Sequence, residues 1–289
     1  MVRVLRKQDW FHADGFPISI ERRDPQEPFG LHAHDFSELV LITGGRGLHV
    51  TGRESWPLAA GDVFVIGPSR PHDYRNMADL RLINILFEPR VLEKQTWDLP
   101  ALPGYHALFN LEPAWRSRHQ FRSRLHLQAP ELARAVALVD MIDEELQRRD
   151  PGFAALVVAS FMQLIGYLAR CYSRSRDPDT RSLLRIAEAI THLESRYDQP
   201  INLDELASIA HMSKRTFMRA FTRATGTTPI AYLIQLRVRH AAALLRREPL
   251  NISEVAYRVG FEDSNYFSRQ FRQIMGSSPR EYRRASVSA

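Results

Sequence analysis

The stretch GFEDSNYFSRQFR, residues 260–272, decides the fold of the C-terminal region. Asp263 or Ser264 can cap a helix there, and Phe267 and Phe271 stand four residues apart, which places both rings on one face. We expect that face to be buried. Four polar side chains of the same helix avoid it and are expected to face outward: Asn265, Ser268, Arg269 and Arg272.

The same pattern occurs about 50 residues earlier, where Phe217 and Phe221 take the places of the two rings. The offset between the copies is 49 residues in the first helix of each and 50 residues afterwards, because one residue is inserted at the later turn, near Glu262. The outward-facing residues of the earlier copy are Lys214, Arg215, Thr216, Met218, Arg219 and Arg223. An internal repeat of this kind indicates one supersecondary unit used twice.

Each copy has the sequence features of a helix-turn-helix. In the first copy, Asn202 can cap a short helix, and Ser213 can cap a second helix that ends at Gly226. In the second copy, Ser253 is expected to cap the first helix. A long helix over about 229–247 is expected to join the two copies.

The outward-facing residues of both copies suit double-stranded DNA. An α-helix fits the major groove, where arginine pairs well with guanine and asparagine with adenine. Two such helices held about one DNA turn apart, roughly 34 Å, could enter successive major grooves. The alternative is that they are solvated faces of ordinary helices, but this would require the same arrangement to arise twice.

The distribution of charge supports this interpretation. The whole chain of 289 residues carries a net charge of +6. Residues 180–289 hold 17 basic and 10 acidic residues, a net of +7, whereas the first 179 residues hold 22 and 23, a net of −1. A basic part beside a nearly neutral part indicates a module that binds a polyanion, joined to a module with another role.

At these residues the chain resembles the DNA-binding domain of the AraC/XylS family of bacterial transcription regulators, over about residues 184–285. The most specific part is the stretch at 260–272, followed by Gly276, Pro279 and Tyr282. The resemblance implies base contacts from Arg215, Met218 and Arg219 in the first motif, and from Ser264, Asn265, Ser268 and Arg269 in the second. Lys214 and Arg272 are expected to contact phosphate, which positions the protein without reading sequence.

The N-terminal region predicts a small antiparallel β-barrel or sandwich. Residues 39–42 and 63–66 are apolar, rich in β-branched side chains and close to glycines. His32 and His34 are two residues apart, so they share a face in a strand, and Glu38 has the same parity. With His72 from a later strand they could form a three-histidine, one-glutamate set that suits Zn, Fe, Mn or Ni.

The spacing of these residues resembles both motifs of the cupin barrel, over about residues 28–90, with a departure at 67–69. Three interpretations remain open: a metal that performs chemistry, as in a cupin metalloenzyme; a pocket for a small polyol, with or without a divalent metal; and histidines that only support the fold. The region is also similar to the sensor domains of the L-rhamnose-responsive regulators of the AraC/XylS family, which implies effector sensing rather than catalysis. The expected effector-binding residues are His32, His34, Glu38, Arg46, His72 and Tyr74, with Asn84 and Trp56 as further candidates.

Between the two regions the sequence predicts two helices. Residues 131–149 show helical spacing of apolar residues, and residues 153–169 are apolar on nearly every face. The second run is at the lower limit for a membrane span and contains Ser160 and Gln163, so a core or subunit interface is expected instead. The lone Cys171 allows no intrachain disulfide, and the first ten residues lack the apolar core of a signal peptide, which favours the cytoplasm.

Together these observations predict an α+β chain: a cupin-like sensor barrel at 1–128, a two-helix dimerisation segment at 131–174, a linker at 175–183, and an all-α domain with two helix-turn-helix motifs at 184–285. The predicted function is a DNA-binding transcription regulator, an activator rather than an enzyme, controlled by a sugar or sugar acid. Its expected partners are double-stranded DNA, the effector, RNA polymerase and a second copy of the chain, with no membrane. The alternative is a cupin metalloenzyme with a basic appendage.

Overall fold

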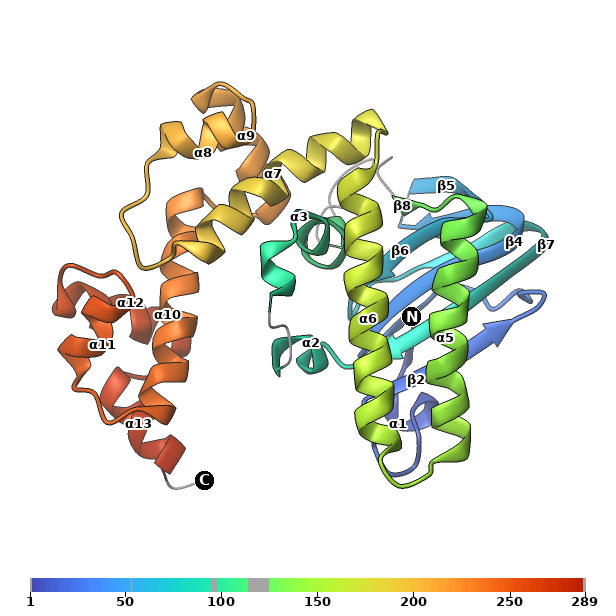
Figure 1. Cartoon of the computed structure of the whole chain (residues 1–289), viewed down its shortest axis with the longest axis horizontal. Helices are drawn as coiled ribbons and strands as arrows, with labels where there is room; N and C mark the ends of the chain where they lie inside the picture. The colour runs from blue at the N-terminus through green and yellow to red at the C-terminus, as the bar shows by residue number, and fades with distance from the viewer. Residues whose placement is uncertain (1, 53, 95–97, 114–124, 288–289) are drawn as a thin grey trace. The chain divides into compact units, whose positions relative to one another are not determined.

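The computed structural model describes residues 2–52, 54–94, 98–113 and 125–287. The chain divides into two compact units, Met1–Ala187 and Glu188–Ala289. The first unit combines β-sheet with helices, and the second contains helices and no strand in its described residues (Figure 1). This division confirms the predicted fold class, a β-rich N-terminal part followed by helices and an all-α C-terminal part.

The first unit is built on a six-stranded antiparallel sheet. Its central strands β4 (Ser37–Thr51) and β7 (Asp73–Phe87) pair along most of their length. The order is β2-β7-β4-β6-β8, and β5 also pairs with β4. The remaining strands of this sheet are β2 (Ile18–Arg23), β5 (Glu54–Ala59), β6 (Asp62–Ile66) and β8 (Leu125–His126). In the described residues no backbone pairing joins β2 to β8, so the predicted barrel is not closed by hydrogen bonds between these two outer strands.

A second, two-stranded parallel sheet lines part of the site described below. It pairs β1 (Arg3–Leu5) with β3 (His32–His34). A single antiparallel bridge between His32 and His72 ties β3 to the chain just before β7. The two histidine-bearing segments are therefore brought together by backbone pairing.

The long strands bend where β4 contains consecutive glycines. The β4–β7 register shifts between Ile42 and Leu48. Gly45 has a φ of +68°, and a Cβ at this position would lie 1.8 Å from the backbone oxygen of Asp79. Only glycine combines this backbone conformation with so close an approach.

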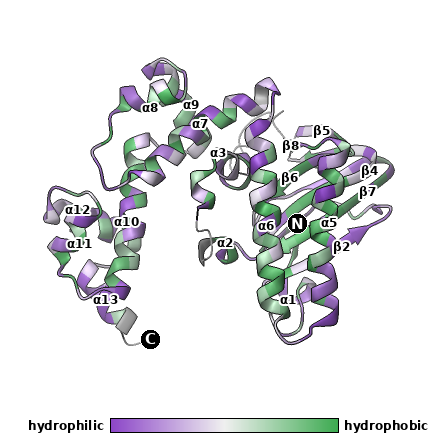
Figure 2. Ribbon diagram, viewed as in Figure 1, coloured by the Kyte–Doolittle hydropathy of each residue, from purple (hydrophilic) through white to green (hydrophobic). Residues whose placement is uncertain are grey.

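Two long helices lie side by side against the sheet: α5 (Ala129–Arg148) and α6 (Phe153–Arg174) (Figure 1). A capping box at Gln128 and Glu131 starts α5. By length and composition α6 could cross a membrane, but close to half of its most apolar window is buried. Its Phe161 is fully buried and packs on Phe87 of β7, as in the core helix of a globular unit. Figure 2 shows hydrophobic colouring along most of α6. Shorter helical segments are α1 (Lys7–Trp10), α2 (Arg90–Lys94), η1 (Leu99–Ala101), α3 (Pro103–Tyr105) and η2 (His106–Leu111).

The segment predicted as a linker, 175–183, is mostly helical. Helix α6 ends at Arg174 and α7 (Pro178–Ser195) begins four residues later. Asp177 accepts hydrogen bonds from the backbone nitrogen and the hydroxyl of Thr180, which is the pattern of a helix N-cap, and proline is well tolerated in the first turn. A polar, proline-containing stretch can thus start a helix as well as form a linker.

The helical unit contains two successive helix-turn-helix motifs. The first is formed by α8 (Leu203–Ile209) and α9 (Lys214–Thr225), and the second by α11 (Ile252–Arg258) and α12 (Ser264–Met275). Helix α10 (Pro229–Arg247) joins them, and α13 (Pro279–Val287) follows. The predicted helices and their order are confirmed.

The caps of these helices agree with the sequence analysis at three positions and differ at one. Asn202, Ser213 and Asp263 each accept a hydrogen bond from a backbone N–H in the first turn of their helices. The prediction that Ser253 caps α11 is wrong, because Asn251 caps it in a capping box with Glu254. Ser253 instead lies within the first turn of the helix.

Candidate functional site

The two second helices of the motifs, α9 and α12, present matching faces. Phe217 and Phe221 of α9 and Phe267 and Phe271 of α12 are all fully buried. Both helices end at a glycine in the left-handed conformation, with φ of +79° and +78°. The repeat inferred from sequence is therefore also a repeat of packing, and it fixes which side chains of each helix reach solvent.

The predicted DNA-contacting residues lie on the outer faces of these helices. The exposed ones are Lys214, Arg215, Thr216, Arg219, Arg223, Asn265, Arg269 and Arg272. Met218, Ser264 and Ser268 are half-buried. The hydroxyl of Ser268 donates to the backbone oxygen of Ser264 over 2.8 Å, so it must exchange this bond to donate to a base.

Some exposed side chains already make weak contacts. The ammonium of Lys214 lies 3.0 Å from a carboxylate oxygen of Asp204, both more than half exposed. The guanidinium of Arg269 lies 5.9 Å from the ring centre of Tyr266. Such exposed contacts are worth about 1 kcal/mol or less, so DNA can replace them.

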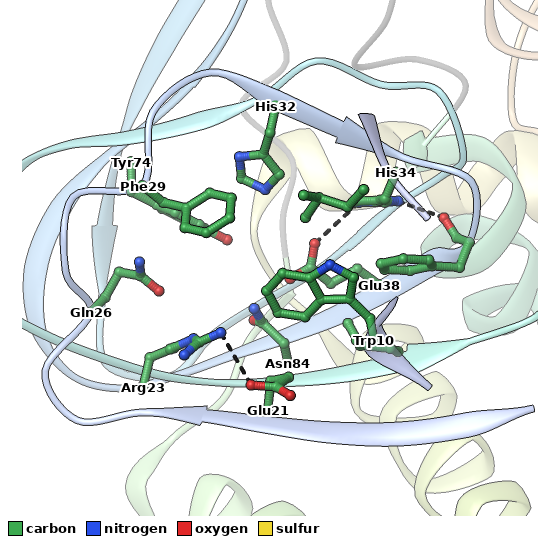
Figure 3. Close-up of a pocket in the computed structure, with 13 residues that line it drawn as sticks. Trp10, Glu21, Arg23, Gln26, Phe29, His32, His34, Glu38, Tyr74 and Asn84 are labelled. Carbon is green, nitrogen blue, oxygen red and sulfur yellow. Dashed lines mark hydrogen bonds and ion pairs between the residues drawn. The ribbon is translucent and has the colours of Figure 1, made fainter. Parts of the chain in front are cut away.

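The first unit contains a pocket that opens between β2, β3, β4 and β7. His32, His34 and Glu38 line one side of it, and Tyr74 and Asn84 also face it (Figure 3). His72 lies close behind this wall, with its Nε2 3.5 Å from a carboxylate oxygen of Glu38. Five of the six predicted effector-binding residues are therefore brought together.

Arg46, the sixth, does not line this pocket. It is exposed and pairs with Ala59 and Ala78 where the β4 register shifts after the two glycines. Trp56, for which two roles were open, packs on the sheet core and against the ring of His49, 4.7 Å between centroids.

The opposite wall of the pocket carries charged residues that the sequence analysis did not single out. Glu21 and Arg23 of β2 form an ion pair of 3.1 Å and point into the pocket with Asn84 (Figure 3). Glu21 stands directly opposite Asn84 in the β2–β7 register. The Asn84 side-chain oxygen is buried and has no hydrogen-bond partner in the described residues. Gln26, Trp10 and Phe29 also line the pocket, and Trp10 lies across it in Figure 3.

Three side chains in this pocket form a compact donor set. Nε2 of His34 lies 3.2 Å and Nε2 of His72 3.5 Å from the same carboxylate oxygen of Glu38. All three residues are buried, and their ligand atoms lie within 4.8 Å of one another. Imidazole nitrogens and a carboxylate in this arrangement fit a divalent transition metal. His32, the fourth residue of the predicted set, does not belong to this group of ligand atoms.

Burial and neighbouring side chains together set the charges in the site. Burial raises the pKa of Glu38, but contacts with His34 and His72 outweigh it, so the pKa lies well below its usual range and the carboxylate is ionised. Burial, reinforced by neighbouring His72, lowers the pKa of His32 to about 4. At neutral pH the site thus combines one carboxylate with neutral His32.

Comparison with known proteins gives matches in both units. The model of the AraC-like ligand binding domain matches residues 18–185, and that of a helix-turn-helix domain matches residues 206–285. The HTH-type transcriptional activator RhaR of Escherichia coli (strain K12) is 33% identical over 280 residues, 96% of this chain and 95% of that protein. RhaR of Salmonella schwarzengrund (strain CVM19633) is 32% identical over 284 residues, 98% and 97% of the two chains. Among solved structures, the DNA-binding domain of AdpA in complex with a target DNA is 36% identical over 36% of this chain and 94% of that one, with a TM-score of 0.35.

Proposed function

The chain belongs to the AraC family of transcription regulators, and we propose that it is an activator whose action on DNA is controlled by a sugar-like effector held in the pocket of its first unit. Membership makes it a DNA-binding regulator with an effector-binding domain, and the family is one of regulators rather than enzymes. The metalloenzyme alternative is therefore rejected. Activation rests on the likeness to RhaR, whose name describes a transcriptional activator.

For DNA, we assign base contacts to the outward residues of α9 and α12. In α9 these are Arg215, Met218 and Arg219; in α12 they are Ser264, Asn265, Ser268 and Arg269. Lys214 and Arg272 are assigned to phosphate, with Thr216 and Arg223 beside them. The support is the matched burial of the two helices, which leaves equivalent positions such as Arg219 and Arg269 exposed.

For the effector, the observation that carries the proposal is the convergence of hydrogen-bonding groups in a concave site. His32, Glu38, Tyr74 and Asn84 face one pocket from three strands, β3, β4 and β7. A ligand with several hydroxyls needs donors and acceptors on more than one side, and the aromatic ring of Trp10 offers an apolar surface for a sugar ring. Sugars and sugar acids fit this description.

Strand β2 offers a route from the pocket to the long helices. Glu21 and Arg23 face the pocket, whereas Arg22 between them points to the other side of the sheet. There its guanidinium contacts Asp140 over 2.7 Å and Asp143 over 2.8 Å, both in α5. An effector that moves β2 would therefore move α5. The effector changes the populations of two arrangements of the protein only as far as it binds one of them more tightly than the other.

We assign residues 1–128 to sensing, 131–174 to pairing of two copies and 184–285 to DNA. Met141 of α5 and Leu156 of α6 are each about half exposed, so these helices present apolar side chains that a second copy would cover in the proposed homodimer. RNA polymerase is the partner that an activator requires, and the cytoplasm is where its DNA lies.

The test is selection of binding sites from random duplex DNA by the purified full-length protein, at stated salt, with and without a panel of sugars and sugar acids. We expect an enriched motif with two elements about one turn apart, and a change in affinity with one compound. Salt-sensitive binding to all sequences alike would refute sequence-specific regulation. An enriched motif that no compound in the panel affects would refute the sugar-like effector alone.

A further inference from the structure

Helix α10 holds the two helix-turn-helix motifs with its two halves. In the first half, Tyr232 contacts Phe221 of α9, with 5.7 Å between the ring centres. In the second half, Ala241 and Leu245 belong to the core that includes Phe267 of α12. In the described residues no extended packing joins α8 or α9 directly to α11 or α12. Because long helices commonly curve, a fixed distance between α9 and α12 requires a further link between the motifs.

That further link is made by Arg237, near the middle of α10. Its Nε donates a hydrogen bond to the backbone oxygen of Tyr197 over 2.6 Å, and its Nη2 donates to that of Gln199 over 2.8 Å. These two residues lie between the end of α7 and the start of α8, so they lead directly into the first motif. The planar guanidinium holds its donors in fixed directions, and it therefore fixes the position of this segment on α10.

The same segment also contacts the second motif. The ring of Tyr197 packs against the core of that motif and stacks on His240 of α10, with 3.8 Å between the ring centres. Gly260, in the turn between α11 and α12, has a φ of +88°, and a Cβ there would lie 2.6 Å from the backbone oxygen of Asp198 and 2.9 Å from Cζ of Arg237. The entry to the first motif and the turn of the second therefore meet at Arg237. Residues 197–199 with Arg237 and Gly260 form the inter-motif junction.

Arg237 differs from the residues assigned to DNA above. It lies on neither recognition helix, and its guanidinium is held by two backbone oxygens of its own chain. Its influence on DNA is therefore expected through the relative placement of the two motifs. Such an influence changes which spacing of the two DNA elements is preferred, whereas the bases preferred within each element depend on the outward side chains of α9 and α12.

We propose that Arg237 is a positioning residue that sets the distance and angle between α9 and α12, and through them the number of base pairs between the two DNA elements that one chain binds. This rests on the base contacts proposed above and adds a requirement for fixed spacing. Inserting one base pair moves one element by about 3.4 Å and turns it by about 35° around the duplex axis. The inter-motif junction prevents the two helices from following that displacement.

The experiment uses the full-length protein and the site selected from random DNA, with versions that carry one base pair more or fewer between the two elements. We expect the wild type to prefer the selected spacing by at least about tenfold in Kd, within the range for one mismatched base pair. Arg237→Met keeps a long side chain and removes the donors. It should lower the spacing preference several-fold and leave the base preferences within each element unchanged. Arg237→Lys keeps the charge and can bond one of the two oxygens, so it should give an intermediate preference.

Arg247→Met is the matched control, since it removes an exposed positive charge from the same helix and should keep the wild-type spacing preference. Equal weakening of Arg237→Met at every spacing would assign Arg237 to fold stability alone and overturn the positioning role, as would an unchanged spacing preference. A wild type that binds all spacings alike overturns the fixed spacing and leaves base recognition standing. Selection of no site at all refutes the proposed DNA recognition itself. Circular dichroism reports folding; if Arg237→Met is unfolded, a wild-type spacing preference in Arg237→Lys overturns the proposal.

Discussion

Arg219→Ala and Arg269→Ala test whether two equivalent positions read two different bases. Each should weaken binding to the selected site by about 1–3 kcal/mol, a factor of about 5–150 in Kd, and relax the preference at one base position. The structure shows which contact Arg269 makes in the absence of DNA. Arg269 leaves only an exposed contact with Tyr266, 5.9 Å from the ring centre and worth about 0.5–1 kcal/mol, so a base contact exceeds what it gives up.

The two effects should add. Arg219 lies on α9, over the core of Phe217 and Phe221, and Arg269 lies on α12, over a separate core around Phe267 and Phe271. Sites with no shared partners are usually additive within about 0.5 kcal/mol. The double variant should therefore lose about 2–6 kcal/mol, which is comparable with the roughly 4–10 kcal/mol that separates specific from non-specific binding.

The assay is a titration of labelled duplexes at several salt concentrations, with the selected site and with sites altered at one base pair. Arg148→Ala is the matched control, since it removes one exposed positive charge from α5 in the first unit. It should leave both affinity and preference unchanged. A uniform loss across all duplexes in Arg269→Ala, with the salt slope reduced by about one, would assign that residue to phosphate and refute the base contact.

Three further predictions concern stability and pH. Phe271→Ala should lower the free energy of unfolding by about 3–5 kcal/mol, measured by a urea titration followed by circular dichroism. Ile274→Ala, in the same helix but partly exposed, should lower it far less. Equal losses of stability in the two variants would contradict the assigned core. Gly45→Ala should prevent correct folding of the sensor, because the added Cβ meets a backbone oxygen of β7. The control Gly52→Ala has open space around its Cβ and should show only backbone strain of about 1 kcal/mol. A soluble, effector-binding Gly45→Ala protein would refute the prediction. Burial raises the pKa of Glu194, so the folded state holds this proton to higher pH than the unfolded state does. The free energy of unfolding should therefore fall as pH rises above 4.5 through the raised pKa. Glu194→Gln should flatten that slope, and an unchanged slope in this variant would contradict the assignment to Glu194.

The helical unit could be predicted in detail because its signals are local. The paired phenylalanines, the caps at Asn202 and Ser213 and the glycine at 226 each act within one or two turns of a helix. The one wrong cap prediction, Ser253 for α11, also concerned a local signal. Asn251 and Glu254 form an N-terminal capping box that the same rules would have found two residues earlier.

The pocket could be predicted only in part. Parity along a strand places His32 and His34 together, but the break between β3 and β4 decides which of them converge with Glu38. Glu21 meets Asn84 only through the register of β2 on β7, which no periodicity near Glu21 reveals. A charged residue on a strand then looks like an ordinary surface residue. Arg46 does not line the pocket, and it lies where the β4–β7 register shifts, which the sequence does not reveal.

The two recognition helices of one chain carry different side chains on the same scaffold. Where α9 presents Lys214 and Arg215, α12 presents Ser264 and Asn265. With the proposed base contacts, a single chain reads two unlike elements, and the half-site of one chain lacks a two-fold axis. Such a half-site has a direction, so that each chain is oriented one way along the duplex. Orientation as well as spacing of the half-sites then becomes part of what the DNA sequence specifies.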